Sequence, residues 1–121
     1  MAFNLSTRAG NLGTSVVEDT AADATRDTPK GSSTTAFAVY IDNTANSGTD
    51  AYLKLWNNAT PTVGTTVPDM VLFCPRSGTR QYNFGDGVVF GTAFTYACTT
   101  SGADSSSASP SAGVQVVMII T

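Results

Sequence analysis

The sequence predicts an all-β protein, a β-sandwich of jelly-roll or immunoglobulin-like type with an extended N-terminal segment. Three observations predict this class. The 12 serines and 19 threonines make up about a quarter of the 121 residues, and threonine favours strands while serine favours turns. Glutamate occurs once and lysine twice, although these residues usually cover helix surfaces. Apolar residues also alternate with small or polar ones in short runs between glycine- and proline-rich segments, which is typical of strands with one buried face.

Residues 1–33 differ from the rest of the chain, and we expect them to form an extended arm or edge segment beside a sandwich domain of residues 34–121. The segment is rich in Thr, Ala, Asp and Gly, so it is too polar to build a core of its own. Residues 15–18 fit a helix capping box. The threonines and aspartates that follow compete for their own backbone, which favours an extended stretch with an edge strand over residues 15–19.

Two apolar residues at the start of this arm, Phe3 and Leu5, are candidate interface residues. Because the arm has no core in which to bury them, we expect a partner or a neighbouring subunit to do so. The arm should then become ordered on assembly.

From residue 34 onward, the alternation predicts a series of short strands. Residues 36–42 place Phe37, Val39 and Ile41 on one face, and residues 51–56 follow after a turn to complete a hairpin. Further strands are expected over residues 70–74, 80–84, 88–90 and 93–98, with Gly85-Asp86-Gly87 as a break between the second and third.

The last strand, residues 114–120, is apolar on both faces, as in a central strand that is covered on each side. One small sandwich offers little to cover both faces. We therefore expect a homo-oligomer, most simply a trimer.

Several chemical and binding functions are disfavoured by composition. The chain has no histidine, which excludes Ser-His and Cys-His nucleophiles and His-ligated zinc. Cys74 and Cys98 lack the paired spacing of a zinc site, and we expect them to be reduced thiols. A net charge of −3 with six scattered basic residues argues against nucleic-acid binding. The sequence has no apolar run of the length that a membrane-spanning helix needs.

The acidic residues do not indicate a catalytic or metal-binding site either. Those at positions 18, 19, 23 and 27 are expected to keep the arm soluble, and the oxygen-rich segment from Asp42 to Asp50 fits a turn better than a calcium loop. Asp86, between two glycines, is expected in a tight turn rather than an ion site. We therefore expect a protein that is not an enzyme and that holds no cofactor or metal.

Three side chains on one face of the 51–56 strand, Tyr52, Lys54 and Trp56, are the other candidate interface residues. Large aromatic side chains beside a cation fit three environments. They can form an interface with another subunit, be buried beneath another part of the chain, or provide an aromatic platform for a sugar. The sequence leaves these three interpretations open.

The same strand begins a segment that resembles small virion proteins of tailed bacteriophages. In that family a YLKLYN strand runs into an A-x-PTVG-T-x-P loop, and an F-x-DG-x-x-F turn follows. Here Tyr52-Leu53-Lys54-Leu55-Trp56-Asn57 leads into residues 59–68, and residues 84–90 read FGDGVVF. Trp56 stands where the family usually has tyrosine. The resemblance covers about residues 36–98.

The resemblance implies a structural role without catalytic residues. The role it implies best is that of a head decoration, or cement, protein, made in the host cytoplasm and bound to the major capsid protein on the virion surface. Repeated contacts on a lattice would turn a modest affinity into strong overall binding. The alternative is a fibre- or tail-associated module that grips a carbohydrate receptor through Tyr52, Trp56 and Tyr82.

Overall fold

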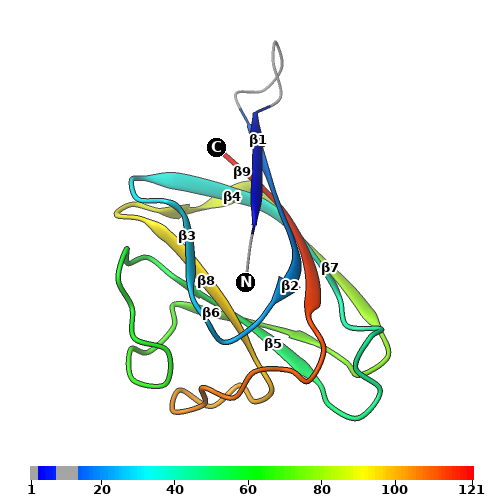
Figure 1. The fold of residues 1–121 in the computed structure, drawn as a ribbon. Helices are drawn as coiled ribbons and strands as arrows, with labels where there is room; N and C mark the ends of the chain where they lie inside the picture. The colour runs from blue at the N-terminus through cyan, green and yellow to red at the C-terminus, as the bar shows by residue number, and fades with distance from the viewer. Residues whose placement is uncertain (1–2, 8–13) are drawn as a thin grey trace.

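The computed structural model describes Phe3, the backbone of residues 4–7, and residues 14–121. These form two antiparallel sheets packed face to face (Figure 1). The strands are β1 (Asn4–Thr7), β2 (Ser15–Ala22), β3 (Asp27–Lys30), β4 (Thr34–Asp42), β5 (Ala51–Trp56), β6 (Met70–Cys74), β7 (Thr79–Phe90), β8 (Phe94–Thr99) and β9 (Val114–Ile120). The all-β class and the β-sandwich predicted from the sequence are confirmed.

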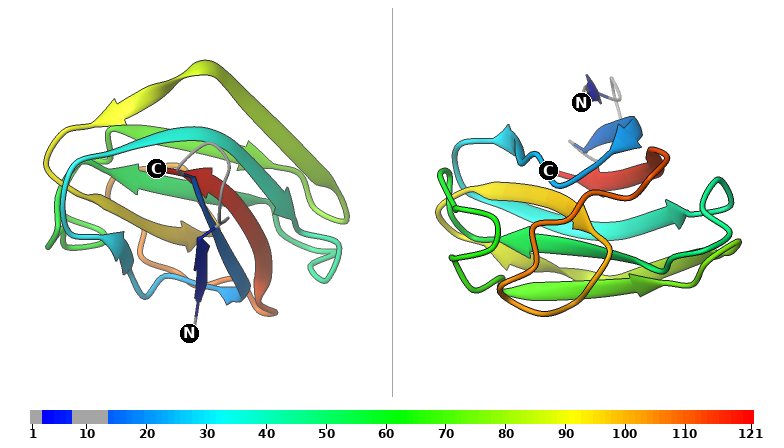
Figure 2. Two further views of the ribbon diagram at one scale, coloured as in Figure 1. Left: turned by 90° about the horizontal axis from the view of Figure 1, so that it is seen from above. Right: turned by 60° about the horizontal axis from the view of Figure 1, so that its bottom comes forward.

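The strand order identifies the sandwich as a jelly roll. One sheet has the order β1-β2-β9-β4-β7 and the other β3-β8-β5-β6. From β2 onward, consecutive strands lie in opposite sheets except for the β5–β6 pair, as in two nested Greek keys. An immunoglobulin-like domain instead keeps its first two strands side by side in one sheet. β1 is an additional edge strand, outside β2 (Figure 2).

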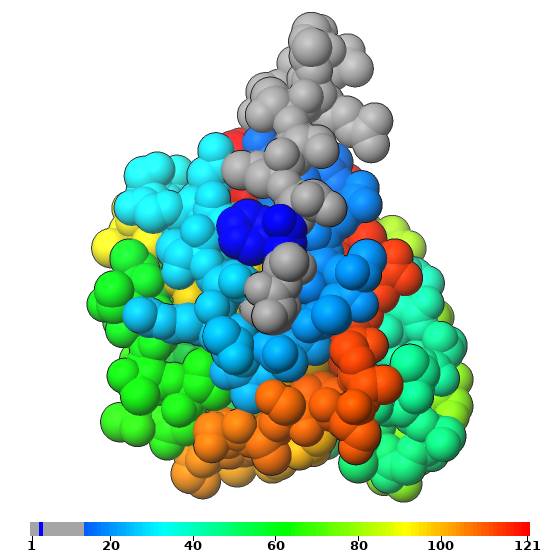
Figure 3. Space-filling view, in the orientation of Figure 1, coloured from blue at the N-terminus to red at the C-terminus, as the bar shows by residue number. Residues whose placement is uncertain are grey.

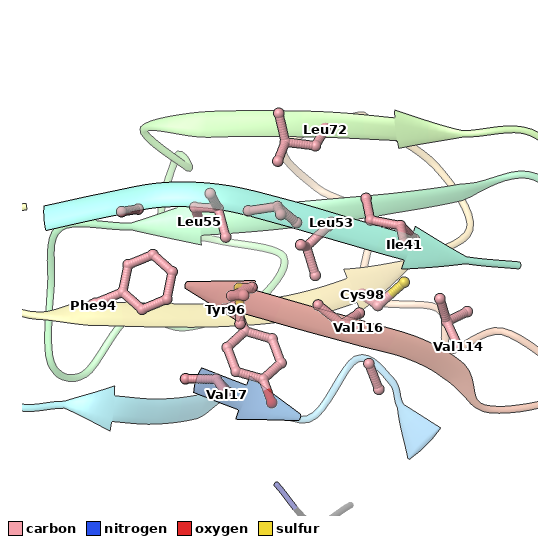
Figure 4. Packing of buried hydrophobic residues seen from close by; sticks show 14 of the residues in the cluster. Val17, Ile41, Leu53, Leu55, Leu72, Phe94, Tyr96, Cys98, Val114 and Val116 are labelled. Carbon is pink, nitrogen blue, oxygen red and sulfur yellow. The ribbon is translucent and has the colours of Figure 1, made fainter. Parts of the chain in front are cut away.

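The core lies between the sheets and is built by the alternate residues that each strand turns inward. The five-stranded sheet contributes Val17, Val39, Ile41, Val116 and Met118, which are fully buried. From the four-stranded sheet come Leu53, Leu55, Phe94 and Tyr96, and the Tyr96 side chain extends toward β2 (Figure 4).

Residues 15–30 belong to the sandwich, so a division of the chain at residue 34 does not describe the structure. β2 is flanked on both sides by strands, and its Val17 and Ala22 side chains lie in the core. β3 pairs with β8 in the other sheet. In the space-filling view these segments, in blue and cyan, occupy the middle of one side of the molecule (Figure 3). β2 adds only these two apolar side chains to the core, because the neighbouring β9 contributes four, Val114, Val116, Met118 and Ile120.

Two strand predictions differ from the structure at a β-bulge. The register between β4 and its neighbours shifts between Ala36 and Ala38, so Ala36 points into the core and Phe37 is only half-buried. The expected break at residues 85–87 is absent: β7 continues through it, with φ of +60° at Gly85 and +104° at Gly87. A side chain at Gly87 would collide with Thr35 and Phe37, which is why glycine suits this bulge.

Candidate functional site

The stripe of Tyr52, Lys54 and Trp56 lies on the outer face of the four-stranded sheet, opposite the core residues Leu53 and Leu55. Two long loops of the same chain, residues 57–69 and 100–113, contact this stripe. Lys54 and Trp56 have no exposed surface. Of the three interpretations, burial beneath another part of the chain therefore describes these two side chains within the monomer.

Trp56 is the centre around which the first loop folds. Its indole Nε1 donates to the Thr66 carbonyl at 3.0 Å. The loop closes on itself where the amides of Thr65 and Thr66 donate to the Thr62 carbonyl, at 3.0 and 2.8 Å. Gly64 takes a φ of +90° within this turn, a conformation that disfavours other residues.

Asn57 and Asp69 tie the two ends of that loop together. The Asn57 amide donates to Asp69 Oδ2 at 2.7 Å, and the Asp69 amide donates to the Leu55 carbonyl at 2.9 Å. Asn57 Oδ1 also accepts from the amides of Thr92 and Ala93. These residues lie in the segment on which the phage resemblance rests, and in this structure their side chains organise a loop.

Lys54 anchors the second loop. Its ammonium Nζ donates to the carbonyls of Ala103 and Ser106, at 2.7 and 3.0 Å. Burial lowers the pKa of Lys54, and the negative charge of Asp104 opposes this effect. A buried cation with two carbonyl partners is a structural tie rather than a free charge for a ligand.

Tyr52 is the one member of the stripe that keeps some exposure. Its ring packs against Gly102 and lies edge-on to Phe73, with ring centroids 5.4 Å apart. Phe73 and Val71 point to the same outer face from β6 and are 37% and 39% exposed. Arg80 lies over the Phe73 ring at 5.9 Å. We call Tyr52, Val71 and Phe73 the β6 patch.

The structure places the side chain of Phe3, but of Leu5 it describes only the backbone. Phe3 is half-buried and packs against the core of its own chain, so a partner is not needed to cover it. Leu5 pairs with Val17 through the β1–β2 ladder, but its side chain lies outside the described residues.

Of the four acidic residues expected to keep an arm soluble, Glu18 is exposed, and the other three are partly or fully buried. Asp19 is fully buried, and its Oδ2 accepts from the Tyr96 hydroxyl at 2.6 Å. The hydrogen bond and the negative charge of Asp19 add to burial in raising the pKa of Tyr96. The alternation of Ser15, Val17 and Asp19 on one face was the signal for this placement.

Asp27 lies opposite Tyr96 in the β3–β8 ladder. Its Oδ2 is buried without a hydrogen-bond partner. Burial, aided by the charges of Asp19 and Asp23, raises the pKa of Asp27 to about 6.

The two thiols are free and fully buried. Burial raises the pKa of Cys98 to about 12 and also raises the pKa of Cys74. Both changes disfavour the reactive thiolate.

The remaining polar segments hold turns. Asn43 Nδ2 donates to the carbonyls of Thr49 and Pro75, and Asn46 Nδ2 donates to Asn43 Oδ1. A shallow surface depression of about 210 Å³ lies nearby, with Asp42 as its single carboxylate. Asp42 Oδ1 already accepts from the amide and hydroxyl of Thr44. Within the part of the chain that the structure describes, no three His, Cys, Asp or Glu side chains gather as a metal site would require.

Comparisons with known proteins identify no relative. No family model, curated protein or solved structure matches this chain. Among the described residues there is no helix long and apolar enough to cross a membrane.

Proposed function

We propose that this chain is a non-enzymatic virion protein of a tailed bacteriophage, a head decoration protein that binds the lattice of the major capsid protein as a small homo-oligomer. The observation that carries the proposal is the presence of two separate apolar patches on opposite outer faces of a rigid sandwich. One is the β6 patch, and the other lies on β4 and β9 around Tyr40 and Ile119, which are 37% and 39% exposed. A decoration protein needs two kinds of contact, one with the lattice and one with its own copies.

Three further features support this role. The residues that carry the phage resemblance form a loop scaffold around Trp56, consistent with a structural rather than a catalytic motif. The jelly roll is a fold used by viral capsid and lectin domains, although a fold by itself does not define a function. The two cysteines, the only thiols of the chain, are buried and have raised pKa values, which disfavour a thiolate nucleophile and fit a non-enzymatic role.

We assign the lattice contact to the β6 patch. Its aromatic and aliphatic side chains are exposed at an edge strand that the two covering loops leave uncovered. Exposed aromatic residues are enriched at protein interfaces, where they supply a large contact area with little loss of conformational freedom.

Co-sedimentation with phage heads tests this proposal. Heads assembled from the major capsid protein of the phage that encodes this chain should bind the wild-type protein to saturation. Phe73→Asp should lower occupancy at least tenfold, which is about 1.4 kcal/mol per site. Thr25→Asp, at an exposed position in the connection between β2 and β3, is the control and should bind as wild type. Absence of wild-type binding would overturn the proposal.

A carbohydrate-binding module is the second candidate, because Tyr52 and Phe73 present two neighbouring aromatic rings. Trp56 is buried and cannot stack on a sugar in this structure, and the Tyr82 hydroxyl donates to the Phe73 carbonyl. Pull-down on polysaccharides of the host surface distinguishes the two candidates. Binding that Phe73→Asp abolishes, without co-sedimentation on heads, would favour the receptor-binding role.

A further inference from the structure

The outer surface of the five-stranded sheet has an apolar centre that no other part of the described chain is shown to cover. On β9, Met118 faces the core, and its neighbours Val117 and Ile119 face outward. On β4, the outward residues are Ala38 and Tyr40, which pair with Ile119 and Val117 respectively. We call these four residues the β4/β9 face. Apolar side chains opposite one another on one face form a continuous surface.

The rim of this face is mostly polar. The row through Ile119 and Ala38 continues to Val16 on β2, which is apolar but only 8% exposed, and to Asn83 on β7. The parallel row through Val117 and Tyr40 continues to Glu18 and Gln81. Glu18 is the one charged side chain in these two rows, and Asp42 follows Tyr40 on the same side of β4. An apolar centre within a polar rim is the usual anatomy of a protein–protein interface.

We propose that the β4/β9 face packs against the same face of a second copy of this chain, in a two-fold contact of sheet on sheet. A surface with neither a basic nor an acidic cluster offers nothing to a strongly charged partner, but it is compatible with itself. Regular antiparallel strands present a pleated surface of the kind that packs about 10 Å from another sheet, as the two sheets of this chain already do. A self-complementary patch gives a closed dimer, in place of the trimer expected from the sequence.

The size of the face sets the strength of this contact. Four strands about 4.8 Å apart, each with about seven residues at about 3.3 Å, cover about 400 Å² per copy. The total of about 800 Å² lies below the range of about 1,200–2,000 Å² for stable specific interfaces and within that of weak, transient contacts. The free protein should therefore be in a reversible, concentration-dependent equilibrium between monomer and dimer. The inference deepens the self-association part of the proposed function but does not depend on a capsid.

Sedimentation velocity of the free protein over a wide range of concentration tests the proposal. The wild type should shift from monomer to dimer as concentration rises. Ile119→Lys places a charge at the centre of the face and should weaken dimerisation at least tenfold. Val67→Lys, at a loop position 64% exposed on the side of the other sheet, is the matched control and should dimerise as wild type. Thermal unfolding at the lowest concentration checks that both variants remain folded.

Cross-linking provides an independent readout. Ile119→Cys introduces a thiol beside the proposed two-fold axis, while the native Cys74 and Cys98 are fully buried. A short bis-maleimide should link two copies of this variant and should leave Val67→Cys without a cross-link between copies.

Three results would overturn the inference: a wild-type protein that remains monomeric at every concentration, a trimer, or a dimer that Ile119→Lys leaves intact. A monomer whose head binding is lost on Ile119→Lys would instead assign the face to the capsid. An intact dimer that fails to bind heads would overturn the proposed function alone.

Discussion

The two outer faces of the sandwich both carry large apolar side chains, but only on the four-stranded sheet do loops of the chain cover part of them, around Lys54 and Trp56, while the β6 patch stays exposed. On the four-stranded sheet, two loops bury Lys54 and Trp56 completely. On the five-stranded sheet, Tyr40 and Ile119 remain more than a third exposed. The difference arises from the connections, because the loops before β6 and before β9 are long, whereas β3 and β4 are separated by three residues.

This comparison shows how an outward-facing residue becomes interior. Each covering loop is tied to a polar atom of the stripe it covers, one to the indole Nε1 of Trp56 and the other to the ammonium of Lys54. These hydrogen bonds offset part of the entropy lost when a loop becomes ordered. The β4/β9 face offers the Tyr40 hydroxyl as its only polar side-chain atom, so a second sheet suits it better than a loop.

The largest effect should come from the covered face. Trp56→Ala removes a fully buried indole and leaves the Thr66 carbonyl without its donor, and it should cost about 3–5 kcal/mol of unfolding free energy. Guanidinium unfolding, with Val67→Ala as an exposed control, measures this loss. An unchanged midpoint for Trp56→Ala would show that the loop of residues 57–69 is not a stable cover.

A smaller effect is expected at the second covering loop. Lys54→Met keeps the length of the aliphatic chain but removes the donor to the carbonyls of Ala103 and Ser106. The loss should be about 1–3 kcal/mol, with faster elastase cleavage within residues 100–113. Cleavage at the wild-type rate would mean that other contacts hold the loop.

The side of the sandwich between β2 and β3 belongs to neither outer face, and its stability should depend on pH. The pKa of Asp27 is about 6 in the folded state, against an ordinary value of 3.8. A raised carboxyl pKa means that folding favours the protonated form, so stability should fall as pH rises from about 4 through about 6. Urea midpoints across this range should decrease for the wild type and decrease less for Asp27→Asn. Equal slopes for the two proteins would exclude Asp27 as the cause.

The smallest effect on the stability of the folded monomer should come from the β4/β9 face. Ile119→Lys changes a side chain that is 39% exposed, and in dilute solution it should alter the unfolding free energy by no more than about 0.5 kcal/mol. A large loss of monomer stability would mean that the chain itself covers this face.

Much of the fold could be predicted from alternation. The expected segments 36–42, 51–56, 70–74, 93–98 and 114–120 correspond closely to β4, β5, β6, β8 and β9. β2 is harder to place because it contributes only Val17 and Ala22 to the apolar core, and its third inward side chain is a carboxylate, Asp19. Alternation indicates that Asp19 faces inward, but its partner Tyr96 is 77 residues away and leaves no local signal.

The candidate site was less predictable. Alternation correctly places Tyr52, Lys54 and Trp56 on the face opposite the core, but it carries no information about which loop returns over them. Polar, glycine-rich loops resemble open solvent-exposed segments in sequence. Only the hydrogen bonds from Trp56 to Thr66 and from Lys54 to Ala103 show them to be covers.

Hydroxyl-radical footprinting of the free protein at low and high concentration tests the contrast between the two faces most directly. We expect Trp56 to stay unmodified throughout, because it is buried in the monomer. Tyr40 should be oxidised in dilute solution and protected as the protein associates. Oxidation of Trp56 in the dilute folded protein, or association that leaves Tyr40 as reactive as before, would contradict this account.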